Sequence, residues 1–190
     1  MIVQAFEYMK QNPVPGVLCE FGVWTGDGLE QIEFLGRRDL GGVPVYGFDS
    51  FEGMPPTEVD LKDCHAEVWK PGGYKSDIEA VQRRIPAARL IKGVFSNLLS
   101  LDRYGISKVS FARLDCDIYE GYRDALRLLT PFVGKGTVLL FDEGVAPDDP
   151  RYHDSIRDSG VRAIEEWKQS SGFRLKVLNS KWTEMLAVIE

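Results

Sequence analysis

Acidic side chains follow two apolar runs of this chain, at positions where they could bind a cation or take up a proton. One run ends on Asp115 and Asp117, and a later one ends on Asp142 and Glu143. Asp115 and Asp117 are two positions apart, so in an extended chain their side chains project from the same face. If the two runs are neighbouring strands, four carboxylates converge and raise one another's pKa unless a cation relieves the repulsion. Such hard oxygen ligands suit Mg²⁺ or Ca²⁺, although acids that cap helices or solvate strand ends remain the alternative.

The two earlier apolar runs end on residues that suit an adenosine-type ligand. Gly22 and Gly26 allow close approach of the backbone, and a following helix start offers free N–H groups to an anionic group such as the carboxylate of a methionine moiety. Glu20 could hold the ammonium of that moiety, directly or through water. Asp49, with Ser50 after it, can accept both hydroxyls of a ribose. A tight turn at the glycines and an ordinary loop cap at Asp49 are the alternatives.

The elements that must position these residues alternate along the chain. Apolar runs predict strands over 17–23, 43–50, 88–95, 108–117, 136–144, 174–180 and 183–190. Helical spacing predicts helices over about 2–10, 26–36, 77–84, 96–104, 119–133 and 161–170. The segments 51–76 and 145–159 carry prolines and no steady period, which predicts irregular structure, and Trp69 in the first could contact a ring of a ligand.

This order predicts a doubly wound α/β fold. Strand–helix alternation favours a mostly parallel sheet covered on both faces. The last two runs are separated only by Lys181 and Trp182, which predicts a C-terminal antiparallel hairpin and seven strands in all. Ligands of such sheets lie beyond the carboxyl ends of the strands. The candidate residues should therefore meet there.

Composition excludes several classes of protein. The 190 residues carry a net charge of −6 without a run of Lys or Arg, which argues against a nucleic-acid partner. No apolar stretch approaches the roughly 20 residues that span a bilayer, and the first residues do not resemble a signal peptide. Three cysteines (Cys19, Cys64 and Cys116) form no C-x-x-C pair, and there are only two histidines, so we expect reduced thiols and no zinc site. These features predict a single cytoplasmic domain over 1–190 that does not bind a membrane.

Five motifs, in order, resemble the macrocin O-methyltransferase family, whose members methylate sugar hydroxyls of macrolides and related glycosylated natural products. The two most specific are G-F-D-S-F-E-G-M-P (47–55) and R-L-D-C-D-I-Y-E (113–120). The shorter ones are E-F-G-V-W-T-G (20–26), K-G-V-F (92–95) and F-D-E (141–143). The resemblance runs from about Gly16 to Gly144.

The resemblance implies a class I fold that binds S-adenosylmethionine, a divalent metal that is usually Mg²⁺, and a homo-oligomer such as a dimer. Asp115, Asp142 and Glu143 would be metal ligands, and Asp117 the general base. The methyl-donor site would comprise Glu20, Gly22, Val23, Trp24, Thr25, Gly26, Asp49, Ser50, Phe51, Gly93, Val94, Phe95 and Asp115. The acceptor would be a hydroxyl of a small molecule such as a glycoside.

The chain departs from the family at three places. Glu143-Gly144 stands where Asp-Tyr is more usual, and Gly121-Tyr122 replaces small hydroxyl residues. About 16 residues precede the first predicted strand, which is short for the family. Two alternatives remain: a nicotinamide-dependent oxidoreductase, although the glycines do not give G-x-G-x-x-G, and a binding module without catalysis.

Overall fold

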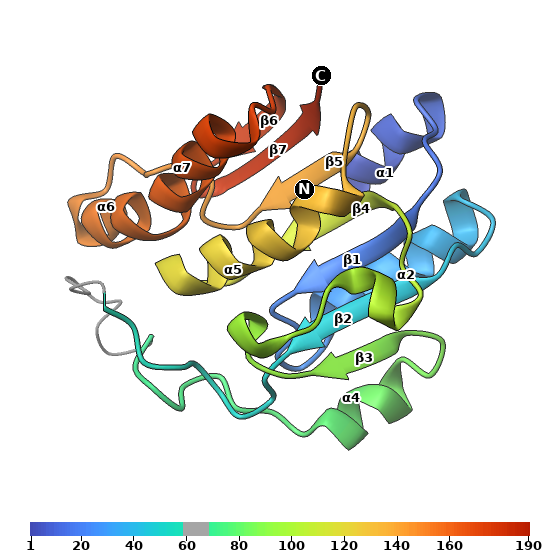
Figure 1. The fold of residues 1–190 in the computed structure, drawn as a ribbon, viewed down its shortest axis with the longest axis horizontal. Helices are drawn as coiled ribbons and strands as arrows, with labels where there is room; N and C mark the ends of the chain where they lie inside the picture. Colours follow the sequence, from blue (N-terminus) through green and yellow to red (C-terminus); the bar gives the residue numbers. More distant parts are fainter. Residues whose placement is uncertain (59–68) are drawn as a thin grey trace.

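A computed structural model describes residues 1–58 and 69–190, so Cys64 and His65 lie outside the described part. Its seven strands form one sheet in the order β3-β2-β1-β4-β5-β7-β6 (Figure 1). The strands are β1 (Val17–Phe21), β2 (Val45–Asp49), β3 (Arg89–Lys92), β4 (Val109–Leu114), β5 (Val138–Phe141), β6 (Leu175–Lys181) and β7 (Glu184–Ile189). The first five run parallel, and β7 pairs antiparallel with both β5 and β6. The doubly wound sheet with its closing hairpin is confirmed.

Helices cover both faces of the sheet, as alternation requires. One apolar core lies between the sheet and α1 (Ile2–Gln11), α2 (Asp27–Asp39) and α4 (Ile78–Arg84). The other lies beneath α5 (Tyr119–Leu129) and α7 (Arg162–Ser171), which are in front of the sheet in Figure 1. Neighbours on one strand, such as Leu18 and Cys19, are buried in opposite cores because side chains alternate along a strand. Among the described residues, none of the helices could span a bilayer.

Two segments differ from the sequence predictions. The predicted helix over 96–104 is a pair of 3₁₀ turns, Phe95–Asn97 and Leu101–Tyr104, because Leu98 and Ser100 between them are extended. The predicted irregular segment 145–159 contains α6 (Pro150–Ile156), which continues through a π-helical turn into α7. Asp149 caps α6 by accepting a hydrogen bond from the Arg151 N–H, and proline suits the first helical position. The Asp-Pro pair was thus a helix signal rather than a loop signal.

Candidate functional site

A cavity of about 460 Å³ opens beyond the carboxyl ends of the parallel strands. Gly22, Asp115 and Asp142, which line it, directly follow β1, β4 and β5, and Asp49 ends β2. Ligand sites of small molecules usually have volumes of roughly 300–1,000 Å³, so this one is large enough for a nucleoside-sized ligand. The position is the one at which doubly wound sheets bind ligands.

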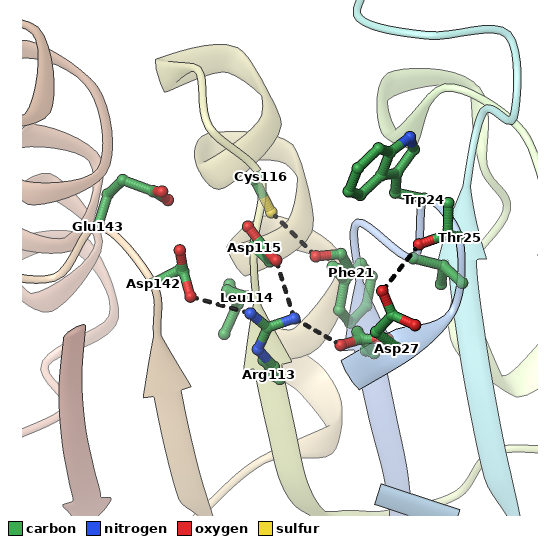
Figure 2. A network of polar contacts seen from close by, with 12 residues as sticks. Phe21, Trp24, Thr25, Asp27, Arg113, Leu114, Asp115, Cys116, Asp142 and Glu143 are labelled. Atoms are coloured by element: carbon green, nitrogen blue, oxygen red, sulfur yellow. Dashed lines mark hydrogen bonds and ion pairs between the residues drawn. The ribbon is translucent and has the colours of Figure 1, made fainter. Parts of the chain in front are cut away.

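Arg113 joins three carboxylates beneath this cavity (Figure 2). Its Nη1 lies 2.7 Å from Glu20 Oε1 and 2.8 Å from Asp115 Oδ2, and its Nη2 lies 2.9 Å from Asp142 Oδ1. Glu20 and Arg113 face each other across the β1–β4 pairing, and Glu20 is completely buried. The sequence reading gave Arg113 no role, although its position two residues before Asp115 in a strand places both side chains on one face.

Gly28, in the first turn of α2, makes room for this ion pair. A Cβ at Gly28 would collide with Glu20 Oε1 and would lie 2.6 Å from Arg113 Nη1. The pair between Glu20 and Arg113 therefore requires a glycine at this position of the helix. The sequence predicts only that Gly28 lies at the start of a helix.

Three carboxylates gather at the carboxyl ends of the strands. Among the described residues, oxygen atoms of Asp115, Asp117 and Glu143 all lie within 4.8 Å of one another. Burial raises the pKa of Asp115 to about 6, although Arg113 acts in the other direction. Burial, and then the neighbouring carboxylates, raises the pKa of Asp117 and of Glu143 well above the ordinary range. A cation would relieve this crowding, and hard oxygen ligands fit Mg²⁺ or Ca²⁺.

Asp117 is held in a strained turn between β4 and α5. Its φ of +57° lies in the left-handed region, which residues other than glycine rarely adopt. The Ile118 N–H donates to the Cys116 carbonyl at 2.6 Å, and a Cβ at Gly121 would lie 2.8 Å from that carbonyl oxygen. The indole of Trp69 also hydrogen-bonds the Asp117 carboxylate, which lowers its pKa against the larger effect of burial. Strain of this kind is concentrated at functional sites.

Glu143 is fixed by Tyr122, a residue to which sequence reasoning gave no role. The Tyr122 hydroxyl lies 2.6 Å from Glu143 Oε2 and 2.9 Å from the Leu114 carbonyl oxygen, and it accepts the Glu143 N–H at 3.0 Å. Tyr122 is completely buried on the core face of α5. The Gly121-Tyr122 departure from the family thus has a structural reason: glycine admits the tight turn and tyrosine orients Glu143.

Asp49 organises the loop between β1 and α2. Its Oδ2 accepts the N–H groups of Val23 at 2.7 Å and Trp24 at 2.9 Å, and its Oδ1 accepts that of Phe51 at 2.6 Å. A carboxylate has about four acceptor positions, so these amides leave roughly one, on Oδ1. Trp24 and Phe51 both have positive φ, which these hydrogen bonds help to maintain.

The structure brings many, but not all, of the predicted site residues to the cavity. Those that line it are Gly22, Trp24, Asp49, Ser50, Val94, Phe95, Asp115, Asp117 and Asp142. Those outside its lining are Glu20, Val23, Thr25, Gly26, Phe51, Gly93 and Glu143. Glu20 lies beneath the floor, and its Oε2 is buried without a hydrogen-bond partner among the described residues.

This chain is similar to known O-methyltransferases. Two relatives from Streptomyces are each 28% identical: 8-demethyl-8-(2,3-dimethoxy-alpha-L-rhamnosyl)-tetracenomycin-C 4'-O-methyltransferase of Streptomyces olivaceus, over 148 residues, and demethyldecarbamoylnovobiocin O-methyltransferase of Streptomyces niveus, over 153 residues. The alignments cover 72% and 75% of this chain. The chain spans only 56% and 58% of the lengths of these relatives.

The chain also resembles solved methyltransferase structures and matches one protein family. The O-methyltransferase NovP superposes with a TM-score of 0.77 at 22% identity, over 98% of this chain and 77% of that one. A calicheamicin methyltransferase gives 0.73 at 19% identity, over 98% and 76%. At this identity the likeness shows the class I methyltransferase fold. Residues 1–166 match the sequence model of the Macrocin-O-methyltransferase (TylF) family. The chain therefore belongs to the macrocin-O-methyltransferase family.

Proposed function

We propose that the chain is an S-adenosylmethionine-dependent O-methyltransferase that acts on a hydroxyl of a small natural product, such as a glycoside. One observation carries this proposal: a single cavity is lined by the Asp49 loop on one side and by Asp115, Asp117 and Asp142 on the other. A methyl donor and a cation-bound hydroxyl would meet in such a cavity. The names of the two Streptomyces relatives, which are O-methyltransferases, point to the same reaction class.

The methyl donor would lie over the loop between β1 and α2, beside those of the predicted residues that line the cavity. Asp49 would accept a ribose hydroxyl on Oδ1, because the loop amides leave an acceptor position on that oxygen. Trp24 and Phe95 supply apolar walls. Glu20 lies beneath the floor and does not line the cavity, so it would act on the donor only indirectly.

A divalent cation, Mg²⁺ or another hard ion, would be held by Asp115, Asp142 and Glu143. The donor set would suit a hard cation because it consists of carboxylate oxygens. Asp115 and Glu143 belong to the crowded cluster with Asp117, whereas Asp142 is not part of that cluster. The chemistry that such a cation supplies is to orient an acceptor hydroxyl and lower its pKa. Asp142 gives one oxygen to Arg113, which leaves its other oxygen for this purpose.

Asp117 acts as the general base. The donor sulfonium is already activated, so the protein must align the two reactants and remove a proton. The hydroxyl oxygen forms its new bond to the methyl carbon as the bond from sulfur breaks, and the hydroxyl proton passes to the Asp117 carboxylate. Asp117 lines the cavity beside Asp115, and a base must come within about 3 Å of the attacking oxygen.

Three further proposals concern the whole chain. Residues 1–190 form one domain, which one continuous sheet from β3 to β6 supports. The protein is cytoplasmic, in keeping with the free buried thiols of Cys19 and Cys116. It forms a homodimer, as the family resemblance implies.

Calorimetry with S-adenosylhomocysteine and with NAD tests the donor part of the proposal. We expect S-adenosylhomocysteine to bind and NAD to show no heat of binding. Binding of NAD alone would support the nicotinamide-dependent oxidoreductase and remove the methyltransferase proposal.

Asp117→Asn tests the catalytic part. We expect the affinity for S-adenosylhomocysteine to stay within about twofold and methyl transfer to a panel of glycosides and phenols to fall by at least about a hundredfold, because the amide cannot take up the proton. Full activity of this variant would remove Asp117 from its role.

A further inference from the structure

Arg113 contacts Glu20, which is buried beneath the cavity, and also Asp115 and Asp142, which line the cavity. It does not line the cavity itself, so it can influence a ligand only through the residues it binds. Its Nη1 is shared by Glu20 and Asp115, and its Nη2 binds Asp142. The side chain is 16% exposed, which makes it a largely buried charge.

Glu20 and the backbone around it hold the Arg113 side chain in place. Glu20 is completely buried and lies opposite Arg113 in the register of β1 and β4. Gly28 completes the pocket, because any Cβ there would collide with the pair. The guanidinium is planar with donors in a fixed fork, so an anchored Arg113 dictates where its other carboxylate partners lie.

Each of these partners is bound through one oxygen. Asp115 gives Oδ2 and Asp142 gives Oδ1, and both residues line the cavity. The contact therefore fixes the rotation of each carboxylate while the second oxygen remains for a ligand in the cavity. Buried ion clusters of this kind add little to folding stability by themselves. A positioning role explains the arrangement better than stability does.

We infer that Arg113 is a positioning residue, anchored by Glu20, that presents the free oxygens of Asp115 and Asp142 to a divalent cation. The inference rests on the proposed function, since it concerns the cation site of the same cavity. It assigns Glu20 an indirect role in cation binding. The fork geometry of Arg113, rather than its charge, is the feature that matters.

Titration calorimetry with Mn²⁺ in the absence of donor and acceptor tests this directly. Arg113→Lys keeps the charge and loses the planar fork, and we expect at least about tenfold weaker Mn²⁺ binding, as is usual when the residues that orient metal ligands are changed. Arg113→Met should also bind Mn²⁺ more weakly. Arg157→Lys is the matched control: Arg157 contacts two carboxylates, Asp154 and Asp158, on the surface, and its variant should bind Mn²⁺ like the wild type.

The outcomes separate geometry from charge. If Arg113 were only a counter-charge, Arg113→Lys would bind Mn²⁺ normally and Arg113→Met would bind it more tightly, and either result overturns the inference. Glu20→Gln provides a second test that leaves Arg113 in place, should the arginine variants fail to fold. It should weaken Mn²⁺ binding by about threefold, and an unchanged affinity contradicts the role of Glu20 as anchor.

A parallel titration with S-adenosylhomocysteine separates this inference from the proposed function. A wild-type protein that binds S-adenosylhomocysteine but no Mn²⁺ contradicts the inference and leaves the methyl-donor site standing. A protein that binds Mn²⁺ as expected but no S-adenosylhomocysteine contradicts the proposed methyl transfer and not the positioning role of Arg113.

Discussion

Buried charge at single residues sets the properties of the site. Glu20 has no exposed surface, and burial is the main reason that its pKa rises from an ordinary 4.5 to about 8, with Arg113 acting against it. Between these two values the folded protein holds a proton that the unfolded chain has lost. Since the folded state then binds more protons, stability falls as the pH rises through this window.

Replacing Glu20 with Gln should reduce this dependence. In the absence of ligands, the free energy of unfolding of the wild type should fall between about pH 5 and 8. Glu20 contributes up to about 1.4 kcal/mol per pH unit to this fall, the value for one proton, in addition to the other carboxyl groups with raised pKa. Glu20→Gln should show a shallower fall, because the amide does not titrate. Urea unfolding across this range measures both, and identical profiles would show that Glu20 is ionised in the folded protein throughout.

Gly28 offers a test of packing around the same pair. Alanine is favoured over glycine in helices by about 1 kcal/mol, yet Gly28→Ala should lower the free energy of unfolding by about 1–3 kcal/mol because its Cβ displaces the buried ion pair. Gly134→Ala is the matched control, since a Cβ there meets nothing within 4 Å. Chemical denaturation compares the two, and equal stabilities would mean that α2 moves to accommodate the methyl group.

At the scale of elements, two arms of the 51–76 segment form a wall of the cavity. Met54 and the Gly72–Gly73 turn exchange two backbone hydrogen bonds of 2.8 and 2.9 Å, so the arms lie side by side. Glu120, at the start of α5, accepts the Thr57 hydroxyl and the Glu58 N–H, each at 2.8 Å. Hydrogen bonds therefore join the two arms to each other and join the segment to α5.

Trp69 connects this wall to the proposed base. It is buried among Met54, Ile118 and Ile156, and it hydrogen-bonds Asp117. Trp69→Phe keeps most of the packing and loses the N–H, so we expect about tenfold slower methyl transfer with unchanged binding of S-adenosylhomocysteine. Trp167→Phe is the control, because Trp167 is also buried and donates to Thr130 Oγ1 at 2.9 Å away from the cavity. Equal activities of the two variants would contradict the link to Asp117.

At the scale of the whole molecule, the sequence predicts the sheet correctly because the features that indicate strands and turns are local. Apolar runs, glycines after strands and the short Lys181-Trp182 connection are each visible within a few residues. Two predictions were wrong where a signal has two interpretations. The prolines of the segment 145–159 predict irregular structure, but Pro150 begins a helix, and the segment 96–104 contains two 3₁₀ turns in place of the predicted helix.

The site was only partly visible in the sequence for a related reason. Acids at strand ends are local signals, and Asp115, Asp117 and Glu143 do lie together. The partners that orient them are not local: Arg113 binds Glu20 from 93 residues away, and Tyr122 reaches Glu143 across 21 residues. Such contacts depend on strand order and register, which one sequence does not reveal. The same holds for Gly28, whose role depends on a pair formed by two other elements.

A crystal structure with S-adenosylhomocysteine and Mn²⁺, read in an anomalous difference map, tests the central claim most directly. We predict one anomalous peak bound by Asp115, Asp142 and Glu143, with the nucleoside over Gly22 and its ribose at Asp49. A nucleoside in that place without a peak at the carboxylates, or a peak elsewhere, would contradict the metal-assisted mechanism. A cavity above Gly22 that excludes S-adenosylhomocysteine would contradict methyl transfer altogether.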